Sequence, residues 1–504
     1  MVMEEQTLAE LDAAQLRELT QRLLGELRHQ AALLDKLKYE NALLKRMKFA
    51  AQSERFDPQQ KSLLDEELDA DLAAVVQEIE HLSATPVAVT EKQQPKRTPL
   101  PANLPRREIR HEPASTTCPC GCQMKRIGVD VAEKLDYVPG VFTVERHIRG
   151  KWACAQCETI TQAPVAAHVI DKGIPTTGLL AQVLVAKYAD HLPLYRQEGI
   201  FGRAGLAIPR STLAQWVGIC GVRLQPLVDA LKAELLAQPV LHADETPVAM
   251  LKPGHGKTHR AYLWAYAPGA FESMRAVVYN FCESRAGEHA RSFLGDWRGS
   301  LVCDDYAGYK ASFNQGVTEI GCLAHARRKF FDLHAANKSQ IAEHAIKQLA
   351  QVYEIEQQVK DMPEAQRLEI RQQRSRPIMD ALHEWMLRQR QQVAGNSATA
   401  KVLDYSLKRW GALTRFIDDG QLPVDNNWIE NQIRPIAVGR GNWLFAGSLR
   451  AGQRAAAVMS LIQSARLNGH DPYAYLKDVL TRLPTHRASR IEELLAHRWQ
   501  PAPV

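Results

Sequence analysis

The sequence lacks any apolar run long enough to cross a membrane as a helix, which argues against an integral helical membrane protein. It also lacks the apolar segment of a secretory signal at its start, where "MVMEEQTLAELDAAQL" is acidic and amphipathic. We therefore predict a cytoplasmic protein with no membrane partner.

Cysteine is scarce, with nine in 504 residues, so a disulfide scaffold is excluded. Five of the nine lie between residues 118 and 157, which favours a metal site. Zinc takes four tetrahedral ligands, and Cys154-x-x-Cys157 has the spacing of one zinc knuckle. In the first cysteine segment, every second residue from 118 to 122 is a cysteine. We expect Cys118 and Cys120 to complete a zinc ribbon, with Cys122 as the competitor.

The chain also has little excess of one sign of charge over the other. The net charge is +6, which permits a nucleic-acid partner without requiring one. Apolar and charged residues make up 45% and 24% of the chain, as in soluble globular proteins. A chain of 504 residues is too long for one hydrophobic core, so several domains are expected.

Residues 8–50 are predicted to form one long helix, because apolar residues recur at alternating steps of three and four. The pattern fits a coiled coil, and an amphipathic helix packed on its own chain is the alternative. The heptad assignment places Thr20, Leu27, Leu34 and Asn41 at position a, and Leu16, Leu23, Gln30, Leu37 and Leu44 at position d.

Residues 51–117 are rich in Pro, Lys and Arg towards their end and are predicted to be a basic, extended linker. Residues 161–237 are predicted to be helical. A short helix, a Gly-containing turn and a longer helix that opens with polar residues are typical of a helix-turn-helix. Ser211 is the expected N-cap of that last helix, and a small helical bundle without DNA-binding function has the same pattern.

From residue 238 the period changes to that of strands. The pattern predicts strands over "PVLHADETPVAM", "RAYLWAYAP", "RAVVYNFC" and "GSLVCDDYAGY", with a helix before the last of them. A fifth strand in "VTEIGCLAHARRKFFDLHA" runs into a basic helix. "LKPGHGKTH" lacks the first Gly of a phosphate-binding loop and is predicted to be a hairpin turn.

Carboxylates are expected at the carboxyl ends of the first and fourth of these strands. In a ribonuclease-H-like fold the two strands are neighbours, so Asp244 and Asp305 would lie close together and would need a cation. Two Mg²⁺ ions there would serve an in-line displacement at phosphorus. Glu430 is the candidate for a third carboxylate, after an inserted helical domain. Glu245 and Asp304 adjoin the two aspartates, and spacing does not choose between neighbours.

The chain resembles a DDE transposase of the insertion sequence sixty-six family, of the transposase C subunit type. The resemblance rests on "SERFDP", "LDYVPG", "STLAQWV", "HADETPV", "DDYAGY", "CLAHARRKFF", "DNNWIENQIRP", "GRGNWLFAGS" and "SLIQSARLNGHDPYAYL". It implies a ribonuclease-H-like core with a metal-binding and catalytic triad of Asp244, Asp305 and Glu430. The family usually reads Arg-Lys-Asn-Trp where this chain has Gly441 after Arg440.

The resulting fold prediction is multidomain α+β, in six parts. They are a coiled coil or leucine zipper (1–50), a basic linker (51–117), a zinc ribbon (118–160), a helix-turn-helix domain (161–237), a ribonuclease-H-like catalytic domain with a helical insertion near 338–415 (238–450), and C-terminal helices (451–504).

The resemblance implies an enzyme that binds the terminal inverted repeats of an insertion sequence and performs two-metal strand cleavage and strand transfer. The expected cofactors are two Mg²⁺ or Mn²⁺ ions per active site and a structural Zn²⁺. The alternative is a catalytically impaired DNA-binding regulator on the same scaffold. Candidate DNA contacts are Arg434, Arg440, His325, Arg327, Arg328, Arg210 and Ser211.

Expected partners are double-stranded DNA, both element ends and target, and a second copy of the chain joined through the coiled coil. Small accessory proteins from the same element are implied by the resemblance. The expected location is the bacterial cytoplasm, with association to the nucleoid when DNA is bound.

Overall fold

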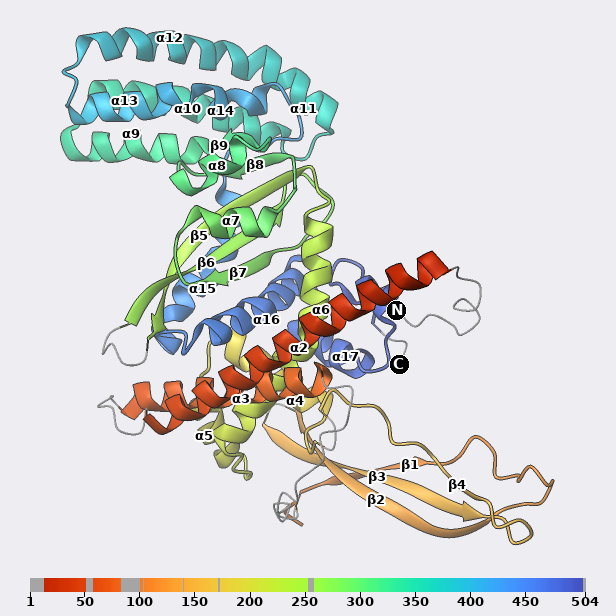
Figure 1. Cartoon of the computed structure of the whole chain (residues 1–504). Coiled ribbons are helices and arrows are strands. Elements are labelled where there is room, and N and C mark those ends of the chain that lie inside the picture. Colours follow the sequence, from red (N-terminus) through yellow and green to blue (C-terminus); the bar gives the residue numbers. More distant parts are fainter. Residues whose placement is uncertain are drawn as a thin grey trace. The chain divides into compact units, whose positions relative to one another are not determined.

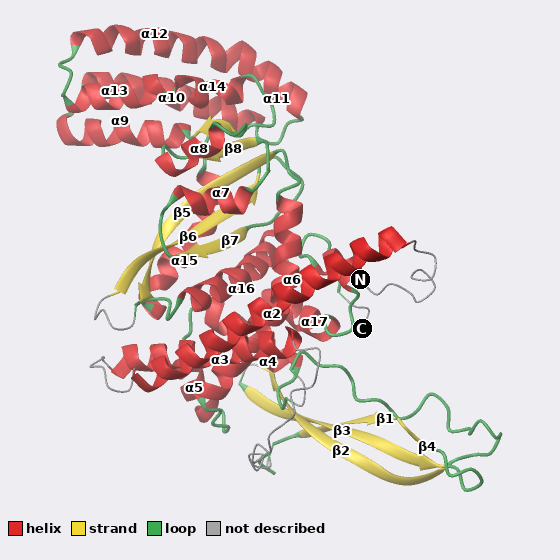
Figure 2. Cartoon of the chain, in the orientation of Figure 1, coloured by secondary structure: helices red, strands yellow, loops and turns green. Residues whose placement is uncertain are grey.

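The computed structural model describes residues 13–50, 58–82, 100–102, 104–138, 140–170, 173–252 and 258–501. They fall into two compact units (Figure 1). The first unit comprises residues 1–165, 172–176 and 194–223, and the second comprises 166–171, 177–193 and 224–504. Figure 2 shows that each unit contains both helices and strands. None of the described helices is long and apolar enough to cross a membrane.

The first unit opens with helix α2 (Ala13–Ala50), which packs on α3 (Pro58–Leu82). The predicted helix is confirmed. Leu37, Asn41 and Leu44 of its heptad are buried, whereas Leu23 and Leu27 are exposed. The carboxyl-terminal part of α2 is therefore packed within its own chain, and a coiled coil between two chains stays a prediction for the exposed part.

The predicted linker over 51–117 is wrong for part of its length. Pro58–Leu82 forms α3, and Arg106–His111 forms strand β1. The helix has a core pattern that the Pro-rich end of the segment concealed, since Leu68 and Val75 are buried. Residues 83–99 of the predicted linker lie outside the described residues.

A four-stranded sheet holds the cysteine module. Strands β2 (Lys125–Val138) and β3 (Val141–Ala153) form a long antiparallel hairpin, and β1 pairs parallel to β3. The short strand β4 (Ile160–Gln162) pairs with the end of β3. This pairing brings the two cysteine-bearing segments to one end of the hairpin.

Three helices follow, as predicted: α4 (Thr177–Tyr188), α5 (Leu194–Arg203) and α6 (Arg210–Leu235). The predicted N-cap at Ser211 is wrong, because α6 already begins at Arg210. The backbone N–H of Arg210 donates to the Glu198 carboxylate at 3.2 Å. An acidic side chain of α5 thus stabilises the amino-terminal end of α6, a position that favours negative charge.

The second unit is built on a five-stranded mixed sheet in the order β7-β6-β5-β8-β9. Strands β5 (Val240–Leu251), β6 (Thr258–Pro268) and β7 (Val278–Cys282) are antiparallel neighbours, and Leu251 pairs with Thr258 as the predicted hairpin requires. The turn itself, residues 253–257, lies outside the described residues. Strands β8 (Ser300–Cys303) and β9 (Thr318–Gly321) run parallel to β5, with α7 (Gly287–Leu294) before them.

Helices surround this sheet. Helix α8 (Lys310–Phe313) follows β8, and α9 (Leu323–Asn337) follows β9. The predicted helical insertion contains α10 (Gln340–Val359), α11 (Glu364–Ile370), α12 (Arg376–Gln392), α13 (Ala398–Lys408) and α14 (Trp410–Thr414). Figure 1 shows the insertion beside β8 and β9. Its core is continuous with the sheet through Val302 and Ile320.

The chain then returns to the sheet. Helix α15 (Asn427–Trp443) contacts β5, and α16 (Leu449–Leu467) packs on β7. A Cβ at Gly452 of α16 would lie 2.2 Å from the Phe281 ring, so this close approach requires glycine. Helix α17 (Pro472–Arg482) packs against α4 and α16.

Candidate active site

Asp244 lies on β5 at the point where the central strands part. The parallel pairing of β5 with β8 ends at His242 and Val302, but β5 continues as far as Leu251 alongside β6. The predicted position at the carboxyl tip of the strand is therefore wrong. Asp244 stands in mid-strand, where the departure of β8 opens the sheet.

Glu245, the neighbour of Asp244, binds other side chains of the protein. Successive side chains of a strand point to opposite faces of the sheet. The Glu245 side chain is only 1% exposed and accepts from Arg285 Nε at 2.7 Å and from the Tyr309 hydroxyl at 3.0 Å. These partners satisfy the carboxylate, so Glu245 is an internal ion-pair residue of this site.

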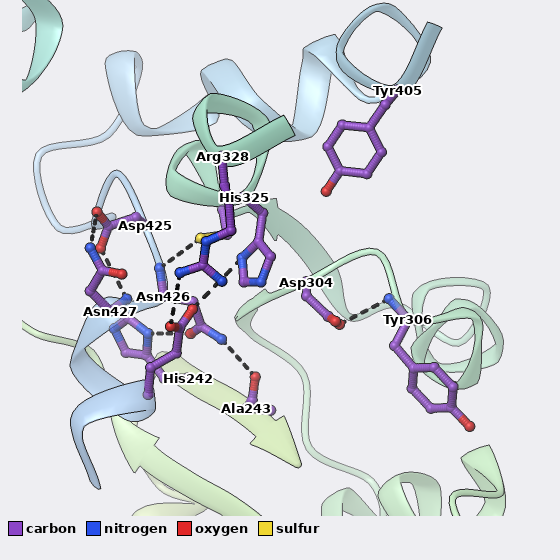
Figure 3. A network of polar contacts seen from close by, with 12 residues as sticks. His242, Ala243, Asp304, Tyr306, His325, Arg328, Tyr405, Asp425, Asn426 and Asn427 are labelled. Carbon is purple, nitrogen blue, oxygen red and sulfur yellow. Dashed lines mark hydrogen bonds and ion pairs between the residues drawn. The ribbon is translucent and has the colours of Figure 1, made fainter. Parts of the chain in front are cut away.

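Asp304 and Asp305 follow β8 and diverge. An Asp304 oxygen accepts the Tyr306 N–H at 2.9 Å, as Figure 3 shows, and its side chain is partly buried. Asp305 is 43% exposed, and its Oδ1 lies 3.5 Å from Nε of Arg409. The structure thus places the predicted Asp305 against an arginine of the insertion.

Glu430 lies in the first turn of α15, and that end of the helix is fixed to β5 by Asn426. The fully buried Asn426 side chain contacts the His242 ring at 2.8 Å and donates to the Ala243 carbonyl at 2.9 Å (Figure 3). Residues Asn426 and His242 therefore set the position of Glu430 relative to Asp244. The sequence signal was the Asn pair before Glu430, but its partner on β5 lies 184 residues away.

The partners of Glu430 come from α9. Its Oε1 lies 3.8 Å from His325 Nδ1, and its Oε2 lies 3.9 Å from Arg328 Nη2. Among the described residues, the ion pairs of Glu430 are these two, and none involves Arg434. Arg434 is exposed, one turn further along α15.

Neighbouring carboxylates act electrostatically on Asp244. Burial raises the pKa of Asp244 to about 8, and the negative charges of Glu245, Asp304 and Glu430 add to the effect. Glu430 Oε1 is buried and has no hydrogen-bond partner among the described residues. A buried aspartate whose pKa is raised by neighbouring carboxylates, together with a Glu430 oxygen that lacks a donor, fits a hard divalent cation such as Mg²⁺.

The other residues predicted to contact DNA differ in whether the protein itself already binds their side chains. Arg327 and Arg328 are exposed on α9, whereas Arg440 donates to the carbonyls of Pro247 and Ala437. A Cβ at Gly441 would meet nothing within 4 Å, so the glycine relieves no steric conflict there. Contact of these residues with DNA stays a prediction.

The predicted zinc site is also formed in the structure. Cys118, Cys120, Cys154 and Cys157 lie together, with all four sulfurs within 4.8 Å of one another. Cys120 Sγ lies 3.7 Å from the sulfurs of both Cys154 and Cys157. Four sulfurs bound to one zinc ion lie about 3.8 Å apart, close to these two distances, whereas the Cys118 and Cys157 sulfurs lie nearer, at 2.7 Å. The set of four thiols suits a structural Zn²⁺.

Cys122 is outside the group of four. Its carbonyl accepts the Cys118 N–H at 2.8 Å, and the residue packs beside the cluster through Cys118 and Cys154. A hydrogen bond from Cys118 lowers the pKa of Cys157 to about 6, so one sulfur of the group is readily ionised for metal binding.

We predict that Cys154→Ser removes one zinc ion per chain relative to the parent protein, because three sulfurs no longer complete the tetrahedron. Cys122→Ser is the matched control and should keep the parent's zinc content. Elemental analysis of the purified full-length variants measures both. Equal zinc loss in the two variants would show that the ligand set is wrong.

The chain thus has a four-cysteine metal module and, separately, a buried Asp244 on the mixed sheet that is under the influence of further carboxylates. This combination defines a multidomain protein with a structural zinc site and an acidic candidate active site. A model described as "Transposase IS66 family" matches residues 172–454, and one described as "IS66 C-terminal element" matches 460–497. The chain belongs to the IS66 transposase family, a class of DNA-processing enzymes.

Two further models match the amino-terminal half. "Transposase C of IS166 homeodomain" matches residues 36–109, and "zinc-finger binding domain of transposase IS66" matches 115–158. The second match agrees with the four-cysteine cluster in the structure.

Similar proteins occur in Sinorhizobium fredii (strain NBRC 101917 / NGR234). The uncharacterized protein y4jD is 38% identical over 417 residues, which cover 80% of this chain and 81% of that protein. The uncharacterized protein y4qI is 37% identical over 461 residues, which cover 88% of this chain and 84% of that protein.

Proposed function

We propose that this chain is a metal-dependent DNA transposase of the DDE type, which binds the terminal inverted repeats of its element and catalyses strand cleavage and strand transfer. The observation that carries the proposal is that the charges of Asp304 and Glu430 act on the buried Asp244, although the three residues come from distant parts of the sequence. Family membership supports the same activity.

The sheet supports a ribonuclease-H-like core. Three antiparallel strands followed by two parallel ones, in the order β7-β6-β5-β8-β9, form the arrangement in which the first and fourth strands are central neighbours. The site lies where these two strands separate. The long helical insertion lies between β9 and α15, so it lengthens the chain between the second and third carboxylates.

Within the predicted triad we propose Asp304 in place of Asp305. Asp304 follows β8 directly, and its charge acts on Asp244, whereas Asp305 is exposed and faces Arg409. The proposed metal ligands are therefore Asp244, Asp304 and Glu430. Asp305 becomes part of the contact with the insertion.

When bound by these carboxylates, two Mg²⁺ ions would supply activation of the attacking oxygen and stabilisation of the leaving oxygen. Residues of the chain keep the proposed ligands in place. Asn426 and His242 fix α15 on β5, so Glu430 keeps its place beside Asp244. Arg328 is 61% exposed beside Glu430, in a position to contact a DNA phosphate.

DNA binding is proposed for the zinc module, the helices α4 to α6 and the basic residues Arg327, Arg328, Arg434, Arg440 and Arg210. The two ends of an element require at least two active sites. The exposed Leu23 and Leu27 of α2 are the residues through which we propose that two copies associate.

The direct test incubates the purified protein with labelled DNA ends of its own element and a target plasmid, with Mg²⁺ or with EDTA. We expect strand cutting and joined products with Mg²⁺ only. Specific binding of the ends without cutting would favour the DNA-binding regulator instead. Cutting without joined products would indicate a nuclease and would contradict the proposal.

A further inference from the structure

A second cluster of metal-binding side chains lies beside the carboxylates. Cys322, His325 and Glu430 each offer one ligand atom, and these three atoms all lie within 4.8 Å of one another. Cys322 and His325 lie at the start of α9, and Glu430 lies on α15. Neither the zinc module nor the proposed magnesium triad accounts for the thiol and the imidazole.

Two atoms of this cluster lack hydrogen-bond partners. His325 Nδ1 and Glu430 Oε1 are both buried, and neither has a partner among the described residues. They face each other at 3.8 Å, which is too long for a hydrogen bond (Figure 3 labels His325). Buried polar atoms without partners are costly, and an ion between them would satisfy both.

The surroundings of the thiol suit a metal-bound sulfur. Cys322 is fully buried and accepts the backbone N–H of Asn426 at 3.2 Å. It is the N-cap residue of α9, although its side chain makes no capping hydrogen bond there. A backbone donor to the sulfur helps to orient it as a metal ligand.

The ligand chemistry selects the ion. Mg²⁺ prefers oxygen ligands, whereas Zn²⁺ accepts thiolate, imidazole and carboxylate ligands and can keep an open fourth position. We propose that Cys322, His325 and Glu430 bind a second Zn²⁺, and that this ion withdraws Glu430 from the magnesium site and inhibits strand cleavage. The inhibition rests on the proposed function, but the zinc site does not.

Zinc content is the first test. We expect two zinc ions per chain in the full-length parent protein incubated with Zn²⁺ and then desalted, and one in Cys322→Ser. Cys282→Ser, which alters a buried thiol outside both clusters, should keep two. His325→Ala, a partly exposed residue, gives a second variant with one zinc ion expected should Cys322→Ser fold poorly. Equal zinc content in the parent and either ligand variant overturns the proposal.

Inhibition is the second test. We expect added Zn²⁺ to lower Mg²⁺-dependent cutting by the parent about tenfold or more, and to lower cutting by Cys322→Ser less than twofold, each relative to its own rate without zinc. An equal zinc effect in both proteins overturns the inhibitory role. Should no variant cut DNA while the zinc contents differ as expected, the zinc site stands and the proposed function fails.

Discussion

Glu430→Gln is expected to reduce Mg²⁺-dependent cutting of element ends by about a thousandfold or more, equivalent to about 4 kcal/mol of transition-state stabilisation. The substitution keeps the size of the side chain and removes the charge that holds the cation. Asn426 and His242 still fix α15 on β5, so the fold and DNA binding should be retained. Single-turnover cleavage and a DNA-binding assay on the same preparation separate the two effects.

A matched pair of variants tests the choice between adjacent aspartates. Asp304→Asn should abolish cutting as Glu430→Gln does, whereas Asp305→Asn should keep most of the parent's rate. The physical reason is that Asp305 is exposed and faces Arg409, while the charge of Asp304 acts on Asp244. The reverse result would restore the triad that the sequence resemblance implies.

Arg371→Met is expected to destabilise the helical insertion by about 3–5 kcal/mol, because it leaves a buried carboxylate without its partner. Arg371 has no exposed side-chain surface and binds Glu356 through two hydrogen bonds of 2.8 and 2.6 Å. Its Nη1 also donates to the carbonyls of Phe416, Asp419 and Leu422. These carbonyls belong to the segment that leads into α15, so the loss should also impair cutting.

The control for this prediction is Arg376→Met. Arg376 pairs with Asp418 on the surface, where the two side chains are 35% and 64% exposed, and such pairs contribute about 1 kcal/mol or less. Amide hydrogen exchange of α10 and α12 reports on the insertion itself, whereas whole-chain melting mixes several domains. Equal protection of these amides from hydrogen exchange in the two variants would contradict a structural role for the Glu356–Arg371 pair.

The sequence predicted most elements of the second unit because each strand and helix has its own periodicity. The five strands, the hairpin after β5 and the insertion before α15 all follow from local pattern and turn residues. The choice of Cys118 and Cys120 over Cys122 also agrees with the structure, since four ligands had to come from two separated segments.

Contacts between distant segments could not be predicted from the sequence. The pairing of Asn426 with His242 depends on how α15 returns to β5, and no local pattern encodes it. The placement of Asp305 against Arg409 depends on the insertion, which arrives more than one hundred residues later in the chain. The helix at Pro58–Leu82 was missed for a different reason, because the adjoining Pro-rich segment dominated the composition.

The central claim is that Asp244, Asp304 and Glu430 together hold divalent cations. Binding of Mn²⁺, as a substitute for Mg²⁺, can be counted by the loss of the electron paramagnetic resonance signal of free Mn²⁺. The assay uses the Cys322→Ser protein, in which zinc fills only the four-cysteine module beforehand. We expect about two Mn²⁺ ions per chain when an uncleavable element end is bound, on the two-metal scheme. Adding Asp244→Asn should abolish this binding, whereas adding Asp305→Asn should preserve it. Undiminished Mn²⁺ binding by the Asp244→Asn protein would contradict the account.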